Sequence, residues 1–225
     1  MQSVKEIVKE LKVFERNKIP VEVKILGIAI YIHTSSVRRT ARILSEIQSV
    51  SKSSVHRWIK KFEEKLPISA EKKQRNLIAI DETVVKANRK RYCIYSAVDV
   101  ERNELILMKV YTTRNYLTTK SFVKEVLEYC ENKPKFIIDK APWLIDALKS
   151  LGLEFENISS FGKRSLVESV FSSLKQRVKI FFCSISCSNP VKSWNLFCKL
   201  FMLYYNRLRW CLSGHVPFFV KIFGK

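Results

Sequence analysis

Apolar residues recur at helical spacing through the first 66 residues, where Gly27 is the only glycine. Between residues 37 and 64 this pattern divides into two helices that are separated by the polar segment 48–53. We expect the inward-facing positions of the first helix to be Ala41, Ile43, Leu44 and Ile47. We expect Ser51 or Ser53 to cap the second helix. The inner stripe of the second helix is formed by Val55, Trp58, Ile59 and Phe62.

Two short helices joined by a polar turn resemble a helix-turn-helix, whose second helix enters the major groove of DNA. The outward residues of the second helix are Ser54, His56, Arg57, Lys60 and Lys61. Arg38, Arg39 and Arg42 add charge on the preceding helix. Because these side chains suit phosphate contacts, we predict that all eight bind DNA. The alternative is an ordinary helical hairpin with a solvated basic face.

The pattern changes to β-strands after residue 76. Apolar runs at 77–80, 92–100 and 105–112, separated by polar turns, predict an antiparallel meander. Helices are expected over 117–130, 143–151, 165–181 and 191–212, with strands over 136–138 and 153–158. This order predicts an α/β fold with a mixed sheet flanked by helices. We therefore expect a helical DNA-binding domain over 1–66, a linker over 67–76 and a catalytic domain over 77–225.

Charge is distributed unevenly along the chain, whose formal net charge is +20. Residues 1–76 hold 17 basic and 8 acidic side chains, residues 77–160 hold 13 and 12, and residues 161–225 hold 11 and 1. Two basic flanks around a neutral middle favour a polyanionic partner, here double-stranded DNA, over a generally basic protein. The six cysteines lack metal-site spacing, and the C-terminal apolar stretch is too polar for a bilayer span. We expect a soluble, cytoplasmic, nucleoid-associated protein.

Two of the four aspartates share one context. Asp81 and Asp139 each follow an apolar run, which predicts that both lie at the ends of central strands. A carboxylate placed there is costly unless it is hydrogen-bonded or bound to a cation. Asp99 fits a hairpin turn and Asp146 an exposed helix position, so both are interpreted as structural.

Glu168 is the only acid in the last 65 residues, and it lies on the predicted helix 165–181. Ser172, Lys175 and Lys179 share its helical face. The alternative is a simple charge arrangement on a solvated helix. Three carboxylates suit hard cations such as Mg²⁺ or Mn²⁺, and two such ions can support phosphodiester chemistry. Lys140 and Lys175 would then position the substrate or stabilise charge.

At these residues the sequence resembles the DDE transposases of insertion sequences, which have a ribonuclease-H-like, retroviral-integrase-like core. It is most similar to insertion sequence family six and its archaeal relatives. The matching segments are Ile80–Thr83, Ala97–Asp99, Thr113–Asn115, Asp139–Pro142, and Val167–Glu168 with Lys175 seven positions later.

The resemblance implies that Asp81, Asp139 and Glu168 bind the catalytic metals and that Lys175 contacts DNA. It further implies an insertion-sequence transposase that binds the element's terminal repeats, cleaves strands and transfers them to target DNA as a homodimer or larger assembly. Two alternatives stay open, an inactive transposase-derived DNA-binding regulator and a related metal-dependent nuclease. The interval of 28 residues between Asp139 and Glu168 is short for the family, so Glu154 and Glu156 are the next candidates for the third ligand.

Overall fold

The computed structural model describes residues 4–14, 18–67, 69–87, 89–157, 168–169, 172–174, 176–177 and 189–208. Contacts divide the chain into two units, Met1–Pro67 with Lys199–Lys225, and Ile68–Cys198. The described residues from Lys199 to Leu208, which we expected to belong to the catalytic domain, therefore group with the N-terminal helices. No helix within the described ranges is long and apolar enough to cross a membrane.

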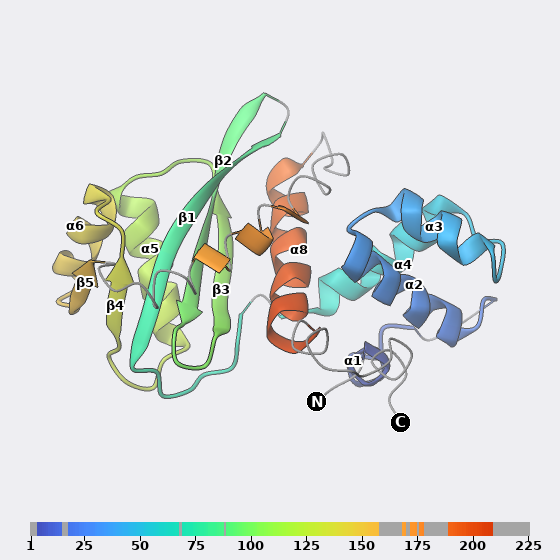
Figure 1. Ribbon diagram of the computed structural model, residues 1–225, viewed down its shortest axis with the longest axis horizontal. Helices are drawn as coiled ribbons and strands as arrows, with labels where there is room; N and C mark the ends of the chain where they lie inside the picture. The colour runs from blue at the N-terminus through green and yellow to red at the C-terminus, as the bar shows by residue number, and fades with distance from the viewer. Residues whose placement is uncertain are drawn as a thin grey trace. The chain divides into compact units, whose positions relative to one another are not determined.

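The described residues of Met1–Pro67 form four helices (Figure 1). They are α1 (Val4–Glu10), α2 (Val21–Thr34), α3 (Val37–Ser45) and α4 (Lys52–Lys65). The Ser51 hydroxyl caps α4 by accepting a hydrogen bond from the Ser54 N–H at 3.1 Å, as the sequence predicted. All four predicted inner residues of α4 are buried. A Cβ added to Gly27 of α2 would lie 3.0 Å from Leu44 Cδ1, so the helices pack closely because this residue is glycine.

The predicted inner face of α3 is partly wrong. Ile43 and Ile47 are 45% and 66% exposed, whereas Val37, Thr40 and Leu44 are buried. The buried positions follow steps of three and four residues, which leaves Ile43 beside the stripe. Ile47 lies beyond the last residue of α3, in the turn, where helical spacing no longer decides which way a side chain points.

The second unit is built on a five-stranded sheet with the order β3-β2-β1-β4-β5 (Figure 1). The strands are β1 (Leu77–Ala87), β2 (Lys90–Asp99), β3 (Glu104–Tyr111), β4 (Lys135–Ile138) and β5 (Phe155–Asn157). Neighbouring strands in the meander β1-β2-β3 run antiparallel, and β4 and β5 run parallel to β1. This is the mixed sheet expected of a ribonuclease-H-like core.

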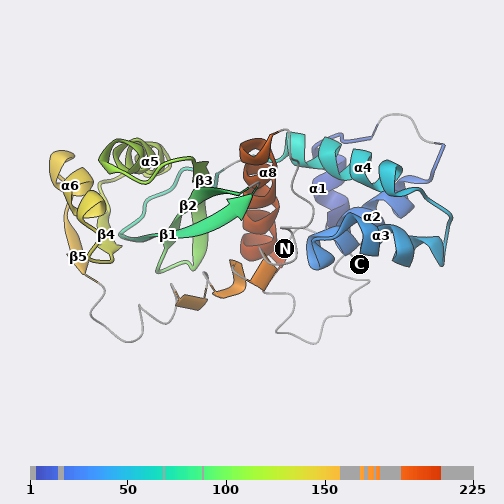
Figure 2. The same ribbon diagram turned by 90° about the horizontal axis from the view of Figure 1, so that it is seen from above.

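Helices α5 (Tyr116–Glu128) and α6 (Pro142–Ser150) lie on one side of this sheet (Figure 2). Phe122 and Val126 of α5 and Leu144 of α6 pack with Ile78 and Ile80 in one buried cluster. The last described helix is α8 (Pro190–Leu203), which continues as the π-helical turn η2 (Tyr204–Leu208). The predicted helix 165–181 falls largely outside the described residues, and the described part of it is helical.

The segment 67–76, which we expected to be a linker, is hydrogen-bonded to the second unit through several of its residues. The Ala70 N–H donates to the Ile106 carbonyl at 2.8 Å, and Lys73 forms a bridge with Cys130. Arg75 is fully buried, and its Nη1 lies 2.8 Å from Asp99 Oδ2 and 3.0 Å from Glu104 Oε2. This segment is therefore part of the second unit.

Asp99 is structural, as the sequence indicated, but it is more than a turn residue. Its Oδ1 accepts the backbone N–H groups of Glu101 and Arg102, while its Oδ2 pairs with Arg75. Replacing Asp99 by Asn leaves the buried guanidinium short of charge compensation. We therefore expect Asp99→Asn to lower the free energy of unfolding by roughly 3 kcal/mol, measured by urea denaturation. Asp146→Asn, at an exposed position of α6, is the matched control and should cause little change.

Glu63 of α4 should make the stability of the helical unit depend on pH. Burial raises the pKa of this carboxyl from the usual 4.5 to about 8, and the Lys199 ammonium only partly opposes the shift. The folded state therefore binds the Glu63 proton more tightly than the unfolded state does. The free energy of unfolding should fall as the pH rises from about 4.5 to 8. Thermal unfolding at several pH values should show this fall, and Glu63→Gln should remove it. An identical pH dependence in both proteins would contradict the prediction.

Candidate active site

Asp81 and Asp139 lie at the same level of two adjacent parallel strands. The register of β1 and β4 pairs Leu77 with Lys135 and Ala79 with Ile137. Continued by two residues, it sets Asp81 opposite Asp139. Side chains of alternate residues share a face, so Asp81 projects from the face of the sheet opposite α5 and α6, and the same alternation continued one residue beyond β4 gives Asp139 the same direction.

Asp81 does not lie at the end of its strand, which corrects the expectation. It is the fifth residue of β1, which continues to Ala87 because its pairing with β2 extends that far. The parallel pairing with β4 ends at Ala79, just before Asp81. Asp139 directly follows β4, as predicted. The two carboxylates therefore lie where the parallel ladder ends, although only one of the two strands ends there.

Local backbone groups hold both carboxylates. Asp81 Oδ1 accepts the Glu82 N–H at 2.7 Å, and Asp139 Oδ1 accepts the Ala141 N–H at 3.0 Å. Asp81 is half-buried and Asp139 is exposed. Oxygen donors of this kind are the ligands that hard cations prefer, so this pair fits Mg²⁺ or Mn²⁺.

Glu82 is the site residue that the sequence reasoning missed. Its side chain is 4% exposed and lies on the sheet face opposite Asp81. Burial, followed by the charges of Asp139 and Asp81, raises the pKa of Glu82 to about 7. Negative charge is therefore concentrated around the end of the β1–β4 ladder, which is an environment that a bound cation would stabilise.

Arg114 forms an ion pair with Glu82. Its Nη1 lies 3.4 Å from Glu82 Oε1, and its guanidinium carbon lies 4.3 Å from the ring centroid of Trp143 in α6. Both Glu82 and Arg114 belong to segments that carried the family resemblance, Ile80–Thr83 and Thr113–Asn115. Their place in these segments was the only indication in the sequence that the two residues belong to the site. Local sequence patterns could not predict the ion pair, because it joins residues 32 positions apart.

The third predicted carboxylate belongs to a segment of which only part is described. Glu168 is helical and exposed, and Leu174, in the described helical residues 172–174, is buried. Lys140 is exposed next to Asp139, whereas Lys175 and Lys179 lie outside the described residues. Among the described residues, no three His, Cys, Asp or Glu side chains stand together as a metal-binding group. Thus the β1–β4 register aligns Asp81 with Asp139, and the described part of the chain does not show Glu168 joined with them in one group.

The predicted DNA-binding residues lie on α3 and α4. Arg38, Arg39 and Arg42 are exposed, and together with Ser36 they line a cavity of about 410 Å³. On α4, Ser54 is half-buried, and the other predicted residues are exposed. Those exposed residues are His56, Arg57, Lys60 and Lys61. The structure therefore places all eight side chains where a ligand can reach them.

Residues 76–185 match the model of a protein family that is described as a DDE domain and named for IS240-type transposases. An uncharacterized protein of Methanocaldococcus jannaschii, MJ0017, is 41% identical over 206 residues, which cover 92% of this chain and 95% of that protein.

Among solved structures, the chain is similar to a simian T-cell lymphotropic virus intasome, with a TM-score of 0.48 and 14% identity, over 85% of this chain and 75% of that one. It is also similar to the HTLV-2 integrase catalytic core domain in complex with magnesium. That match has a TM-score of 0.45 and 15% identity, over 60% of this chain and 88% of that one. The chain therefore belongs to one family with the archaeal protein MJ0017, and its residues 76–185 match the IS240-type DDE domain.

Proposed function

We propose that the protein is the transposase of an insertion sequence of the family-six type, which binds the element ends and cuts and joins DNA strands. The observation that carries this proposal is the register of β1 and β4. It sets Asp81 level with Asp139 in a segment that matches a DDE domain.

The proposed metal site consists of Asp81, Asp139 and Glu168. When bound, two Mg²⁺ or Mn²⁺ ions would activate the attacking oxygen and stabilise the leaving oxygen of the phosphodiester. The chain's own task is to hold these carboxylates toward the substrate. The backbone N–H groups of Glu82 and Ala141 support this by fixing one oxygen of each aspartate. Lys140, Lys175 and Lys179 are proposed to contact the DNA backbone near the site.

The helical unit is proposed to recognise the element's terminal repeats. Ser51-capped α4 would enter the major groove, and the basic residues of α4 and the arginines of α3 would contact the DNA. Cutting and joining two ends requires both ends to be held at once, so the proposed active form is a homodimer or larger assembly on DNA.

Loss of a carboxylate should stop catalysis without stopping DNA binding. We expect Asp81→Asn, Asp139→Asn and Glu168→Gln each to reduce strand cleavage and joining at least about a hundredfold, since each removes a charged metal ligand. The measurements are cleavage of a labelled terminal-repeat duplex and a gel shift with the same duplex. Asp146→Asn is the control for removal of an aspartate outside the site. Asp99→Asn would not be suitable as a control, because Asp99 is needed for the fold.

Near-normal joining by Glu168→Gln would show that the third ligand is another residue. Glu156 would then be the first to test. Glu156 pairs with Ile137 in the β4–β5 register, which puts it on the sheet face expected for Asp139. Its Oε2 lies 3.0 Å from Lys135 Nζ. Glu154 would be tested next.

Catalysis should require a hard divalent cation. An all-carboxylate site favours oxygen-loving ions, so Mg²⁺ or Mn²⁺ should support cleavage and EDTA should abolish it. Ca²⁺ should permit DNA binding with little turnover, because its looser coordination holds the in-line geometry poorly. The measurement is the cleavage rate in each ion at constant ionic strength.

Each failure would point to a specific alternative. Full cleavage in EDTA would refute the metal mechanism. Binding of terminal DNA without cleavage in any ion would favour a transposase-derived regulator. Cleavage without any joining would favour a nuclease.

A further inference from the structure

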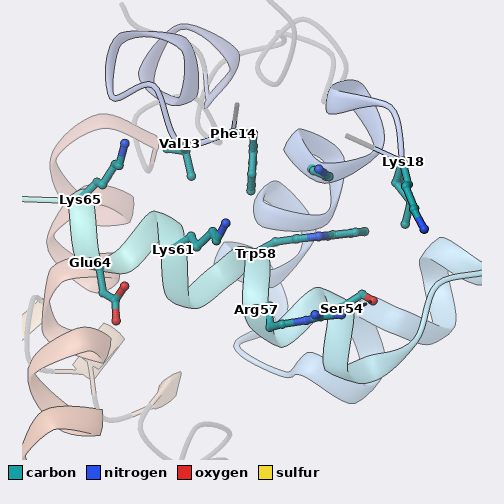
Figure 3. Close-up of a pocket in the computed structure, with 11 residues that line it drawn as sticks. Val13, Phe14, Lys18, Ser54, Arg57, Trp58, Lys61, Glu64 and Lys65 are labelled. Carbon is teal, nitrogen blue, oxygen red and sulfur yellow. Dashed lines mark hydrogen bonds between the residues drawn. The ribbon is translucent and has the colours of Figure 1, made fainter. Parts of the chain in front are cut away.

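The helical unit contains a cavity of about 730 Å³ beside the predicted DNA-binding residues of α4 (Figure 3). One wall is a stripe of α4 that includes Ser54, Arg57 and Lys61. The facing wall comes from the chain before α2, with Val13 and Phe14, and from α2 itself. The cavity is within the usual size range of a ligand pocket.

Positive charge surrounds this cavity. Among the described residues that line it, Lys18, Lys24, Arg57, Lys61 and Lys65 are basic and Glu64 is acidic. All of these except Lys24 are exposed, so the charged rim is in contact with solvent. Such an excess of cations in one concave site favours an anionic occupant.

Lys24 is held at the cavity by two aromatic rings. It is only 6% exposed, and its Nζ lies 4.9 Å from the ring centroid of Phe14 and 5.9 Å from that of Trp58. The ring faces stabilise the ammonium and restrict its movement. Burial and the neighbouring Lys61 lower the pKa of Lys24, so a bound anion would relieve an existing electrostatic cost.

The cavity divides the exposed surface of α4 into two faces. Ser54, Arg57 and Lys61 line it at steps of three and four residues, whereas His56 and Lys60 are exposed but do not line it. The helix α4 therefore presents one face to the cavity and a separate face outward.

We propose that this cavity binds a phosphate of the backbone of duplex DNA, with Lys24 and Lys61 as its main contacts. This inference rests on the proposed function and adds a contact that is independent of base sequence. Duplex DNA is the occupant that the charge favours, because the exposed cations Arg57 and Lys61 continue from the cavity onto the helix proposed to enter the groove. Lys24 is the pre-positioned contact, because the two rings hold it before DNA arrives.

The test measures the affinity of the full-length protein for random-sequence duplex DNA by fluorescence anisotropy, in EDTA and at several salt concentrations. Each lost phosphate contact should reduce the slope of log affinity against log salt by about 1 and weaken binding roughly tenfold at 0.1 M salt. We expect these changes for Lys24→Met and for Lys61→Met. Lys24→Arg, which keeps the charge, should retain most of the affinity.

Lys9→Met is the matched control, because Lys9 is an exposed lysine of α1 that does not line the cavity. Unchanged slopes for both Lys24→Met and Lys61→Met would overturn the inference, and so would an equal loss for Lys9→Met. Lys61 is exposed, so Lys61→Met should fold normally. This variant keeps the test decisive even if Lys24→Met does not fold. Failure of the unaltered protein to bind any DNA would instead refute the proposed function itself.

Discussion

The parallel pairing of β1 with β4 is the constraint on which the candidate active site depends. Ile78 and Ile80 pack against α5 and α6, which fixes the face that the alternate residues of β1 present. Phe136 and Ile138 do the same for β4. A slip of one residue would move Asp139 to the helix-covered face and bury Phe136 on the wrong side, so the apolar packing on one face sets the carboxylate geometry on the other.

Electrostatic interactions are arranged in two distinct ways around this sheet. At one end, the buried Arg75 and Asp99 neutralise each other and fasten the chain segment before β1 to the turn after β2. At the other end, Asp81 and Asp139 concentrate negative charge, which acts even on Glu82 through the sheet. The first arrangement contributes to folding, whereas the second is costly unless a cation binds, which is typical of a functional site.

The helical unit differs from the sheet in the sign of its surface charge and in the role that is proposed for it. Its apolar core, which includes Leu200 and Leu203 from the end of α8, supports α3 and α4 from inside. Their outer surfaces then carry the basic side chains that a polyanion requires. Because residues near position 200 complete this core, a fragment that ended at residue 66 would lose part of the packing on which the DNA-binding surface rests.

Sequence alone determined the features that depend on local patterns. The order of the described helices and strands, a serine cap at Ser51 or Ser53, the inner stripe of α4 and the special context of Asp81 and Asp139 all follow from periodicity and from neighbouring residues. Tertiary structure alone decided that Asp81 is level with Asp139, that Arg75 is buried in the expected linker, and that Lys24 lines a basic cavity. Each of these joins residues more than twenty positions apart, or side chains from different elements, and hydrophobic periodicity carries no information about which distant elements pair or in which register.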